Sequence, residues 1–280
     1  MNSSFSINGR VYPEMAFGTW KVELENAKSV IGNAINCGFR YFDLAAAYGN
    51  GLEVVSELKK CGIARESLII SDKLWNTKRG FDKATRAVKS SLKRMGLDYL
   101  DMMLIHWPAS KCEYSNWEEI NLDTWKALED LYCSGVLKAI GVCNFHPHHL
   151  DIIMERAEIK PMLNQIEYHP GFTQNKVVGF CKDNGILVEA WSPLGNGKVL
   201  TNTELVNLAN KYNKSVAQVC LKWCIQNGVL PVTKACSIGH MRENRDIFDF
   251  EISEPDMEMI NCLDGIALSG MEPDKINIFV

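Results

Sequence analysis

The chain has 280 residues, of which 46% are hydrophobic and 23% are charged. Its 30 lysines and arginines nearly balance 34 aspartates and glutamates, so the net charge of -4 offers no overall basic field for nucleic acid or an anionic membrane. The apolar runs are too short to cross a membrane, and residues 1–12 lack the basic start and apolar core of a signal peptide. We therefore expect a cytoplasmic protein with neither a membrane nor a nucleic-acid partner.

The first predicted element is a β-hairpin over residues 5–12 that turns at Asn8-Gly9. Eight strand-like runs follow it. Several of them are continuously apolar, as is typical of parallel strands that are covered on both faces. They begin near Met15, Phe39, Leu68, Tyr99, Leu137, Met162, Ile186 and Val229.

Amphipathic segments separate these runs. In three of them apolar residues recur at helical spacing, which places them on one face of a helix. The stripes are Leu24, Ala27, Ile31, Ala34 and Ile35, then Phe81, Ala84, Val88, Leu92 and Met95, then Trp125, Leu128, Leu131 and Tyr132. Two further helical patterns, over residues 203–212 and 216–227, lie between the last two strands.

Eight strands with helical connections predict a (β/α)8 TIM barrel, with the N-terminal hairpin capping its bottom. No linker, composition shift or repeat divides the chain, so we expect a single domain over residues 1–280. The competing doubly wound dinucleotide fold carries G-x-G-x-x-G after its first strand. Gly18-Thr19-Trp20 stands there instead, and the motif occurs nowhere in the sequence.

Neither the cysteines nor the histidines predict a metal site. The ten cysteines form no C-x-x-C pair and are expected to be reduced thiols, mostly in the core. Cys220 and Cys224 share a helix side but lack further ligands nearby. In the run from His146 to His149, Pro147 suits the first turn of a helix, and no carboxylate or cysteine is placed to complete a site.

Polar side chains stand at or just after the ends of three adjacent predicted strands, which is where barrel enzymes gather their functional groups. Asp43 ends the second strand, with Tyr48 in the loop after it, while Lys73 ends the third strand and His106 the fourth. Each alone is more often a loop charge or a hydrogen-bonded core residue. Together they suit protonation of an alkoxide. A nearby ammonium stabilises a phenolate and lowers the phenol's pKa, Asp43 would hold Lys73, and His106 would steer a carbonyl oxygen toward Tyr48.

With these residues in these positions, the chain resembles the aldo-keto reductase family over essentially its whole length. The matching strings, in family order, are GTW at 18–20, FDLAAAYGN at 42–50, SDKLWNT at 71–77, LIHWP at 104–108, GVCNF at 141–145, NQIEYHP at 164–170, AWSPLG at 190–195 and the segment 234–244. The tail with Glu272-Pro273-Asp274 looks most like small microbial members that reduce keto sugars, keto acids and aldehydes. The resemblance implies NAD(P)H-dependent reduction of aldehydes or ketones, with a catalytic tetrad of Tyr48, Asp43, Lys73 and His106.

The resemblance also implies the cofactor site. Its positions from the nicotinamide to the adenosine end are Gly18, Thr19, Trp20, Asp43, Cys143, Asn144, Gln165, Trp191, Ser192, Leu194, Lys234, Ser237, His240, Glu243 and Asn244. Cys143 and Trp191 replace the family's usual Ser and Tyr. His240 stands where NADPH-specific members carry Arg, and histidine is only partly charged near neutral pH. We therefore expect NADPH as cofactor, with only a weak preference over NADH.

Aromatic residues at the same strand ends predict the substrate pocket, although core packing is the alternative for the tryptophans. In the family these positions wall the pocket, and here they are Trp20, Tyr48, Trp75, His106 and Trp107. Tyr114 and Trp117, in the loop of residues 109–121, would add to that wall. A small-molecule carbonyl compound is the expected partner, and the resemblance implies a monomer.

Two other functions stay open. The fold also serves non-catalytic, cofactor-binding proteins with regulatory or structural roles, against which the intact tetrad argues. A different barrel enzyme would use Lys73 as a Schiff base, and Tyr48 would then have no purpose.

Overall fold

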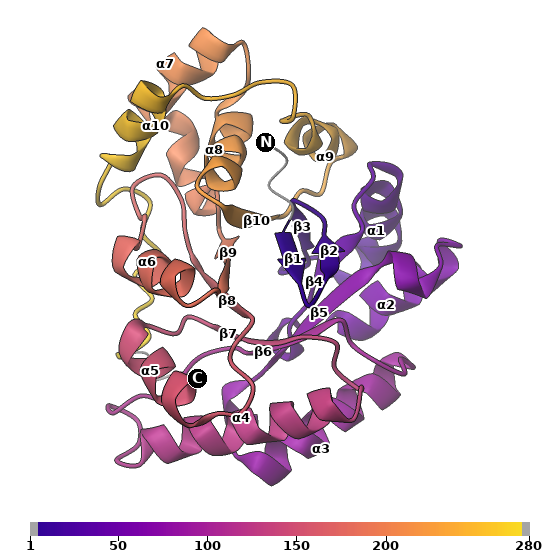
Figure 1. Ribbon diagram of the computed structural model, residues 1–280. Helices are drawn as coiled ribbons and strands as arrows, with labels where there is room; N and C mark the ends of the chain where they lie inside the picture. The colour runs from indigo at the N-terminus through magenta and orange to yellow at the C-terminus, as the bar shows by residue number, and fades with distance from the viewer. Residues whose placement is uncertain (1–4, 276–280) are drawn as a thin grey trace.

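Eight parallel strands close into a barrel in the order β10-β3-β4-β5-β6-β7-β8-β9 (Figure 1). The computed structural model describes residues 5–275. The strands are β3 Ala16–Gly18, β4 Tyr41–Asp43, β5 Ile69–Leu74, β6 Met102–Ile105, β7 Ile140–Cys143, β8 Leu163–Glu167, β9 Leu187–Trp191 and β10 Val229–Thr233. Each begins within three residues of its predicted start, so the predicted barrel is confirmed. The two largest offsets arise where Leu100 and Leu137 form an isolated parallel bridge ahead of β6 and β7.

The N-terminal hairpin consists of β1 Phe5–Ile7 and β2 Arg10–Tyr12. Asn8 and Gly9 both have positive φ angles, as a two-residue turn of the favoured handedness requires. Apolar side chains of the hairpin pack with residues at the start of the barrel strands, such as Tyr12 with Tyr41. The hairpin therefore caps the bottom of the barrel, as predicted.

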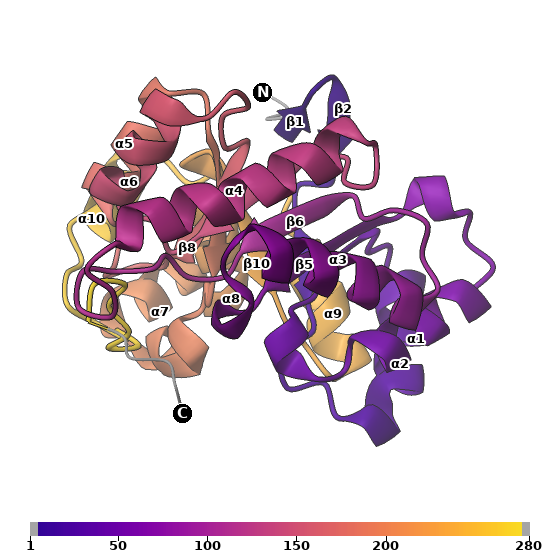
Figure 2. The ribbon, with the colours of Figure 1, turned by 90° about the horizontal axis from the view of Figure 1, so that it is seen from below.

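Helices surround the barrel on its outside, as two perpendicular views show (Figures 1 and 2). They are α1 Ala27–Asn36, α2 Gly51–Lys60, α3 Phe81–Met95, α4 Trp117–Cys133, α5 Pro147–Arg156, α6 Asn175–Asp183, α7 Thr203–Tyr212, α8 Val216–Gln226, α9 Ile238–Arg245 and α10 Glu254–Asn261. Short 3-10 turns precede four of them, namely η1 Leu24–Asn26, η2 Ala46–Tyr48, η4 Asn76–Lys78 and η5 Gly195–Thr201, while η3 Arg65–Ser67 precedes β5. Among residues 5–275, no helix is long and apolar enough to span a membrane.

The helical stripes face the strands, with one exception. In α3 the stripe residues Ala84, Val88 and Leu92 are buried. The prediction for Leu24 is wrong, because this side chain is 55% exposed. Leu24 lies in the turn η1, and the α-helical periodicity begins only at Ala27.

The inside of the barrel changes character along its axis. At the bottom it is apolar, with buried residues such as Ile69, Met102 and Leu230. Toward the carboxyl ends of the strands the inward side chains become polar. Buried charged groups are stable there only when they are paired or hydrogen-bonded. The candidate site is built on this polar layer.

Candidate active site

An ion pair between adjacent strands forms the centre of the site. The parallel register of β4 and β5 sets Asp43 beside Ser71, and Lys73 follows two residues later on the same face. Lys73 Nζ lies 2.7 and 2.6 Å from the two carboxylate oxygens of Asp43 and 3.3 Å from the hydroxyl of Tyr48. The lysine is fully buried, so its charge depends on these contacts.

His106 closes the site from the end of β6. Its ring meets that of Tyr48 edge-to-face, with 6.1 Å between centroids, and contacts Trp75 in the same way at 5.2 Å. Trp107 stacks nearly parallel to it at 6.5 Å. Its buried Nδ1 has no hydrogen-bond partner among the described residues. The structure thus brings all four members of the predicted tetrad together, and their catalytic roles stay a prediction.

The pKa of Tyr48 differs from the expectation. Burial raises the pKa of the phenol to about 12, Lys73 lowers it, and Asp43 raises it again. The expected net lowering by Lys73 is therefore wrong for the free protein, because desolvation outweighs an ammonium whose charge Asp43 largely offsets. Tyr48 is fully protonated at neutral pH.

The pKa values of Lys73 and His106 are shifted in opposite directions. Burial disfavours the Lys73 ammonium, but Asp43 overcomes this and raises the pKa of Lys73 above its usual range. Burial, with a smaller contribution from Lys73, holds the pKa of His106 well below 6.5. At neutral pH His106 is therefore a neutral imidazole beside a charged lysine. Its one N–H can donate a hydrogen bond, but the ring does not act as an imidazolium acid.

A second carboxyl group beneath the tetrad escaped the prediction. Glu189, in β9, accepts hydrogen bonds from Tyr41 at 2.6 Å and from Gln165 at 2.8 Å. The same Gln165 nitrogen lies 3.1 Å from Asp43, so it joins the two carboxyl groups. Burial raises the pKa of Glu189 to about 7. The signal in the sequence was one acidic residue inside an otherwise apolar strand, LVEAW.

Two of the residues that the resemblance assigned to the nicotinamide lie next to this network. Asn144 has a left-handed backbone, with φ of 64°, and its amide oxygen accepts a hydrogen bond from the indole of Trp191 at 2.7 Å. Its amide nitrogen donates to the carbonyl of His106 at 3.1 Å. This pairing fixes a partly exposed indole at the barrel mouth.

Cys143 is an inert member of the same group. Its sulfur lies 3.2 Å from the amide nitrogen of Asn144 and 3.9 Å from the amide oxygen of Gln165. Burial raises the pKa of the thiol far above its usual value, so Cys143 is uncharged at neutral pH. It fills the space of the family's usual serine but is a weaker donor.

The loop after β3 is tied to the tetrad through backbone groups. The hydroxyl of Thr19 donates to the carbonyl of Asp43 at 2.8 Å. Asn50, which the prediction did not include, donates to the carbonyls of Thr19 and Val22 at 2.8 and 3.0 Å. Gly18 lies within β3 and is buried, whereas Trp20 just beyond it is 48% exposed.

The residues assigned to the pyrophosphate and adenosine ends lie on two loops and one helix. Ser192 and Leu194 precede the turn η5, and Ser192 has a positive φ of 51°. Lys234 and Ser237 lie in the loop between β10 and α9, and His240, Glu243 and Asn244 lie on α9. Ser237 caps α9 by accepting from the backbone of His240 at 3.2 Å, and Asn244 is buried against Thr233 at 3.2 Å. Lys234, Ser237 and His240 are exposed.

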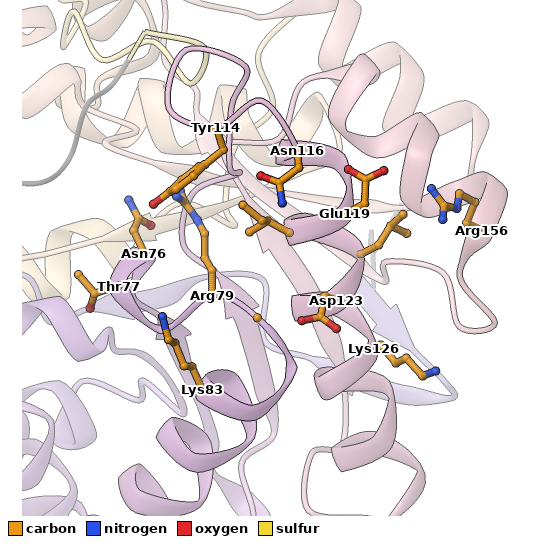
Figure 3. A pocket seen from close by; sticks show the side chains of 13 residues that line it. Asn76, Thr77, Arg79, Lys83, Tyr114, Asn116, Glu119, Asp123, Lys126 and Arg156 are labelled. Carbon is orange, nitrogen blue, oxygen red and sulfur yellow. The ribbon is translucent and has the colours of Figure 1, made fainter.

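The loop after β6 is shorter than the predicted 109–121, because α4 already begins at Trp117. Tyr114 lines a cavity of about 700 Å³ beside α3 and α4, with Arg79 reaching toward it (Figure 3). Trp117 packs instead against His149, with 5.5 Å between ring centroids. The expectation that Trp117 adds to a wall formed by Trp75 and Trp107 is therefore not supported by its contacts.

The histidine run also departs from the prediction. Pro147 begins α5, as expected. The prediction that no carboxylate lies near these histidines is wrong. Asp274, which is distant in the sequence, has an oxygen 2.9 Å from His148.

Comparison with known proteins places the chain among reductases. Residues 14–264 match the Aldo/keto reductase family model. The glyoxal reductase of Bacillus subtilis (strain 168) is 45% identical over 96% of this chain and 95% of its own length. The methylglyoxal reductase DkgA of Escherichia coli O157:H7 is 34% identical over 96% and 95%. The crystal structure of a Bombyx mori aldo-keto reductase in complex with NADP superposes with a TM-score of 0.85, at 31% identity, covering 93% of this chain and 92% of that one.

Proposed function

Because the chain belongs to the aldo/keto reductase family and is an oxidoreductase, we propose that it reduces aldehydes and ketones to alcohols with NADPH, and that Tyr48 donates the proton. The observation that carries this proposal is the position of Lys73, whose ammonium lies between the Asp43 carboxylate at 2.6 Å and the Tyr48 hydroxyl at 3.3 Å. Proton donors in such reactions need a group that stabilises the anion they leave behind.

The chain's own residues would divide the work as follows. Neutral His106 donates a hydrogen bond to the substrate's carbonyl oxygen and holds it near the hydroxyl of Tyr48. Tyr48, protonated at neutral pH, gives its proton to that oxygen as negative charge develops there. Lys73 stabilises the resulting phenolate, and Asp43 keeps Lys73 charged and in place. Because its pKa is raised, Tyr48 carries the proton that this step requires at neutral pH.

The residues at the mouth fit a nicotinamide cofactor, which supplies the hydride when bound. The indole of Trp191 is partly exposed and held by Asn144, and an indole offers a π face on which a nicotinamide ring could stack. Lys234 and Ser237 are exposed at the start of α9, where a phosphate would meet the helix N-terminus. These two residues support NADPH, and His240 supports only a weak preference over NADH.

The substrate class follows from the relatives and from the aromatic mouth. Glyoxal reductase and methylglyoxal reductase are among the similar proteins, so we propose small aldehydes and dicarbonyl compounds as substrates. Trp20, Trp75 and Trp107 would form the pocket's apolar wall around Tyr48 and His106.

We also propose a monomeric, single-domain enzyme of the cytoplasm. Pairing of β10 with β3 closes the barrel within one chain, and the same chain supplies all four residues of the tetrad, which supports a monomer. All ten cysteines are free thiols, which supports a reducing compartment.

The proposal is tested by Tyr48→Phe, assayed by NADPH oxidation with glyoxal, methylglyoxal and other aldehydes. Loss of the proton donor should lower kcat by about 10³-fold while NADPH binding, followed by fluorescence titration, changes less than about twofold. Tyr132→Phe is the matched control, because that hydroxyl accepts a hydrogen bond from Asn8 at the opposite end of the barrel. Substantial turnover by Tyr48→Phe would exclude Tyr48 as the donor. Tight NADPH binding by the unmodified protein without any turnover would indicate a non-catalytic member of the family.

A further inference from the structure

A cluster of three imidazoles and one carboxylate lies outside the tetrad, at the start of α5. The carboxylate belongs to Asp274, in the segment that follows α10. One oxygen of Asp274 lies 2.9 Å from His148 Nε2 and 3.1 Å from His149 Nε2, and the other lies 3.4 Å from His146 Nδ1. The ligand atoms of His146, His148 and Asp274 all lie within 4.8 Å of one another.

We propose that His146, His148 and Asp274 bind a divalent transition-metal ion, Zn²⁺ above all, with solvent at the fourth position. Two imidazoles and a carboxylate are a donor set that zinc accepts, and three protein ligands leave one position open. Ligand atoms about 2.1 Å from a tetrahedral zinc lie about 3.4 Å from one another. The ligand atoms of the three residues already lie within 4.8 Å of one another, with one Asp274 oxygen 2.9 Å from His148 and the other 3.4 Å from His146. Small side-chain rotations would therefore admit the ion.

His149 supplies an independent observation that points at the same place. Its side chain is only 1% exposed, and its Nδ1 accepts the backbone N–H of His146 at 3.1 Å, which leaves the proton on Nε2. That Nε2 is aimed at Asp274 yet has no well-formed hydrogen bond to any described residue. Ligating carboxylates are commonly held by such an outer partner. His149 would therefore orient Asp274, and Trp117, packed against its ring, would hold His149 in place.

The charges around the cluster suit a cation. The carboxylate of Asp274 faces the three imidazoles, with its oxygens 2.9 to 3.4 Å from their ring nitrogens. Glu272 also faces His146 and adds negative charge. The ion would take the place of the N–H through which His148 Nε2 bonds Asp274, and the neutral ring would then carry its proton on Nδ1.

The site would fasten the C-terminal segment to α5. Met271 and Pro273 of this segment line a cavity of about 600 Å³ together with Asn144 and Trp191. A metal at Asp274 would therefore fix one wall of the cavity that reaches the proposed nicotinamide residues. The inference itself does not depend on the proposed reaction.

The test is calorimetric titration of ZnCl₂ into the tag-free, chelator-treated full chain, with Asp274→Asn and His148→Ala as variants. We expect about one ion per chain. Each variant should weaken zinc binding by at least about 100-fold, which is more than the loss of a residue that only orients a ligand would cause. Asp249→Asn is the matched control, because this exposed carboxylate pairs with Lys214 elsewhere and its loss should leave affinity within about twofold.

Cobalt distinguishes this site from the exposed thiols, of which Cys112, Cys133, Cys236 and Cys262 are examples. Co²⁺ at the proposed ligands should give tetrahedral d–d bands without a thiolate-to-cobalt charge-transfer band. Three outcomes would overturn the proposal: no saturable zinc binding up to millimolar metal, equal affinity in Asp274→Asn and the unmodified chain, or a thiolate band that accounts for all bound cobalt. Melting curves recorded in chelator check that each variant folds. His148 is 51% exposed, so His148→Ala keeps the test valid if Asp274→Asn does not fold.

Discussion

The barrel mouth and the segment 234–244 would hold the two ends of one cofactor, yet they are built in opposite ways. At the mouth, Asp43, Lys73 and Glu189 are buried, and each meets partners within 3.1 Å. On the segment, Lys234 and His240 are exposed on a loop and a short helix. Buried charges have to be satisfied together, whereas exposed charges act almost separately. Substitutions at the mouth should therefore have large and coupled effects, and those on the segment small and independent ones.

Lys73→Met should have the largest effect. It leaves the Asp43 carboxylate buried without its cation, so we expect a loss of about 3–5 kcal/mol in the free energy of unfolding and of about 10³-fold or more in kcat. Urea denaturation and steady-state assays measure the two effects.

The coupling itself is tested by the double variant Asp43→Asn with Lys73→Met. It should regain part of the stability, because the uncompensated charge is gone. Lys214→Met is the control, since its partners Asp246 and Asp249 are exposed and its loss should cost less than about 1 kcal/mol. If Lys73→Met were as mild as this control, the contrast between mouth and segment would fail.

This contrast also explains what could be predicted from the sequence. The eight strands and the positions of Asp43, Lys73 and His106 follow from local pattern, because successive parallel strands in a barrel are neighbours and their carboxyl ends meet. The hairpin and most helical stripes are equally local. Leu24 failed because a 3-10 turn interrupts the helical period there.

Contacts between distant segments were beyond local pattern. Glu189 meets Tyr41 across the barrel interior, and that contact depends on which face of β9 turns inward. Asp274 reaches His148 through a segment with no regular structure, whose path has no periodic signal. The net pKa of Tyr48 was also unpredictable, because it depends on a degree of burial that only the fold sets.

Glu189→Gln should have the next largest effect, visible in the pH dependence of stability. Burial raises the pKa of Glu189 from 4.5 to about 7, so between these values the folded state binds the proton that the unfolded state has lost. The contribution of this carboxyl to stability is therefore greatest below about pH 4.5 and falls as the pH rises through 7. Glutamine imitates the protonated form and does not titrate. Relative to the unmodified protein, Glu189→Gln should gain up to about 3 kcal/mol between pH 5 and pH 8.

Urea denaturation at both pH values measures this gain. Glu251→Gln is the control, because Glu251 is 70% exposed and its replacement should shift stability equally at pH 5 and pH 8. A stability difference for Glu189→Gln that does not change with pH would show that the buried layer carries no proton near neutrality.

His240→Arg should have the smallest effect and tests the exposed side of the comparison. An arginine at this position can grip a phosphate with a fork of donors, and an exposed contact of about 1 kcal/mol corresponds to a three- to tenfold lower KM for NADPH. The KM for NADH, which lacks the 2′-phosphate, should change less than about twofold, and added salt should shrink the gain because the contact is exposed. Ser134→Arg adds the same charge at the end of α4 and controls for a general electrostatic attraction. An equal fall in KM for both cofactors would mean that α9 does not face the 2′-phosphate. A lower KM for NADPH alone would show that one exposed residue sets the cofactor preference without any change in the buried mouth.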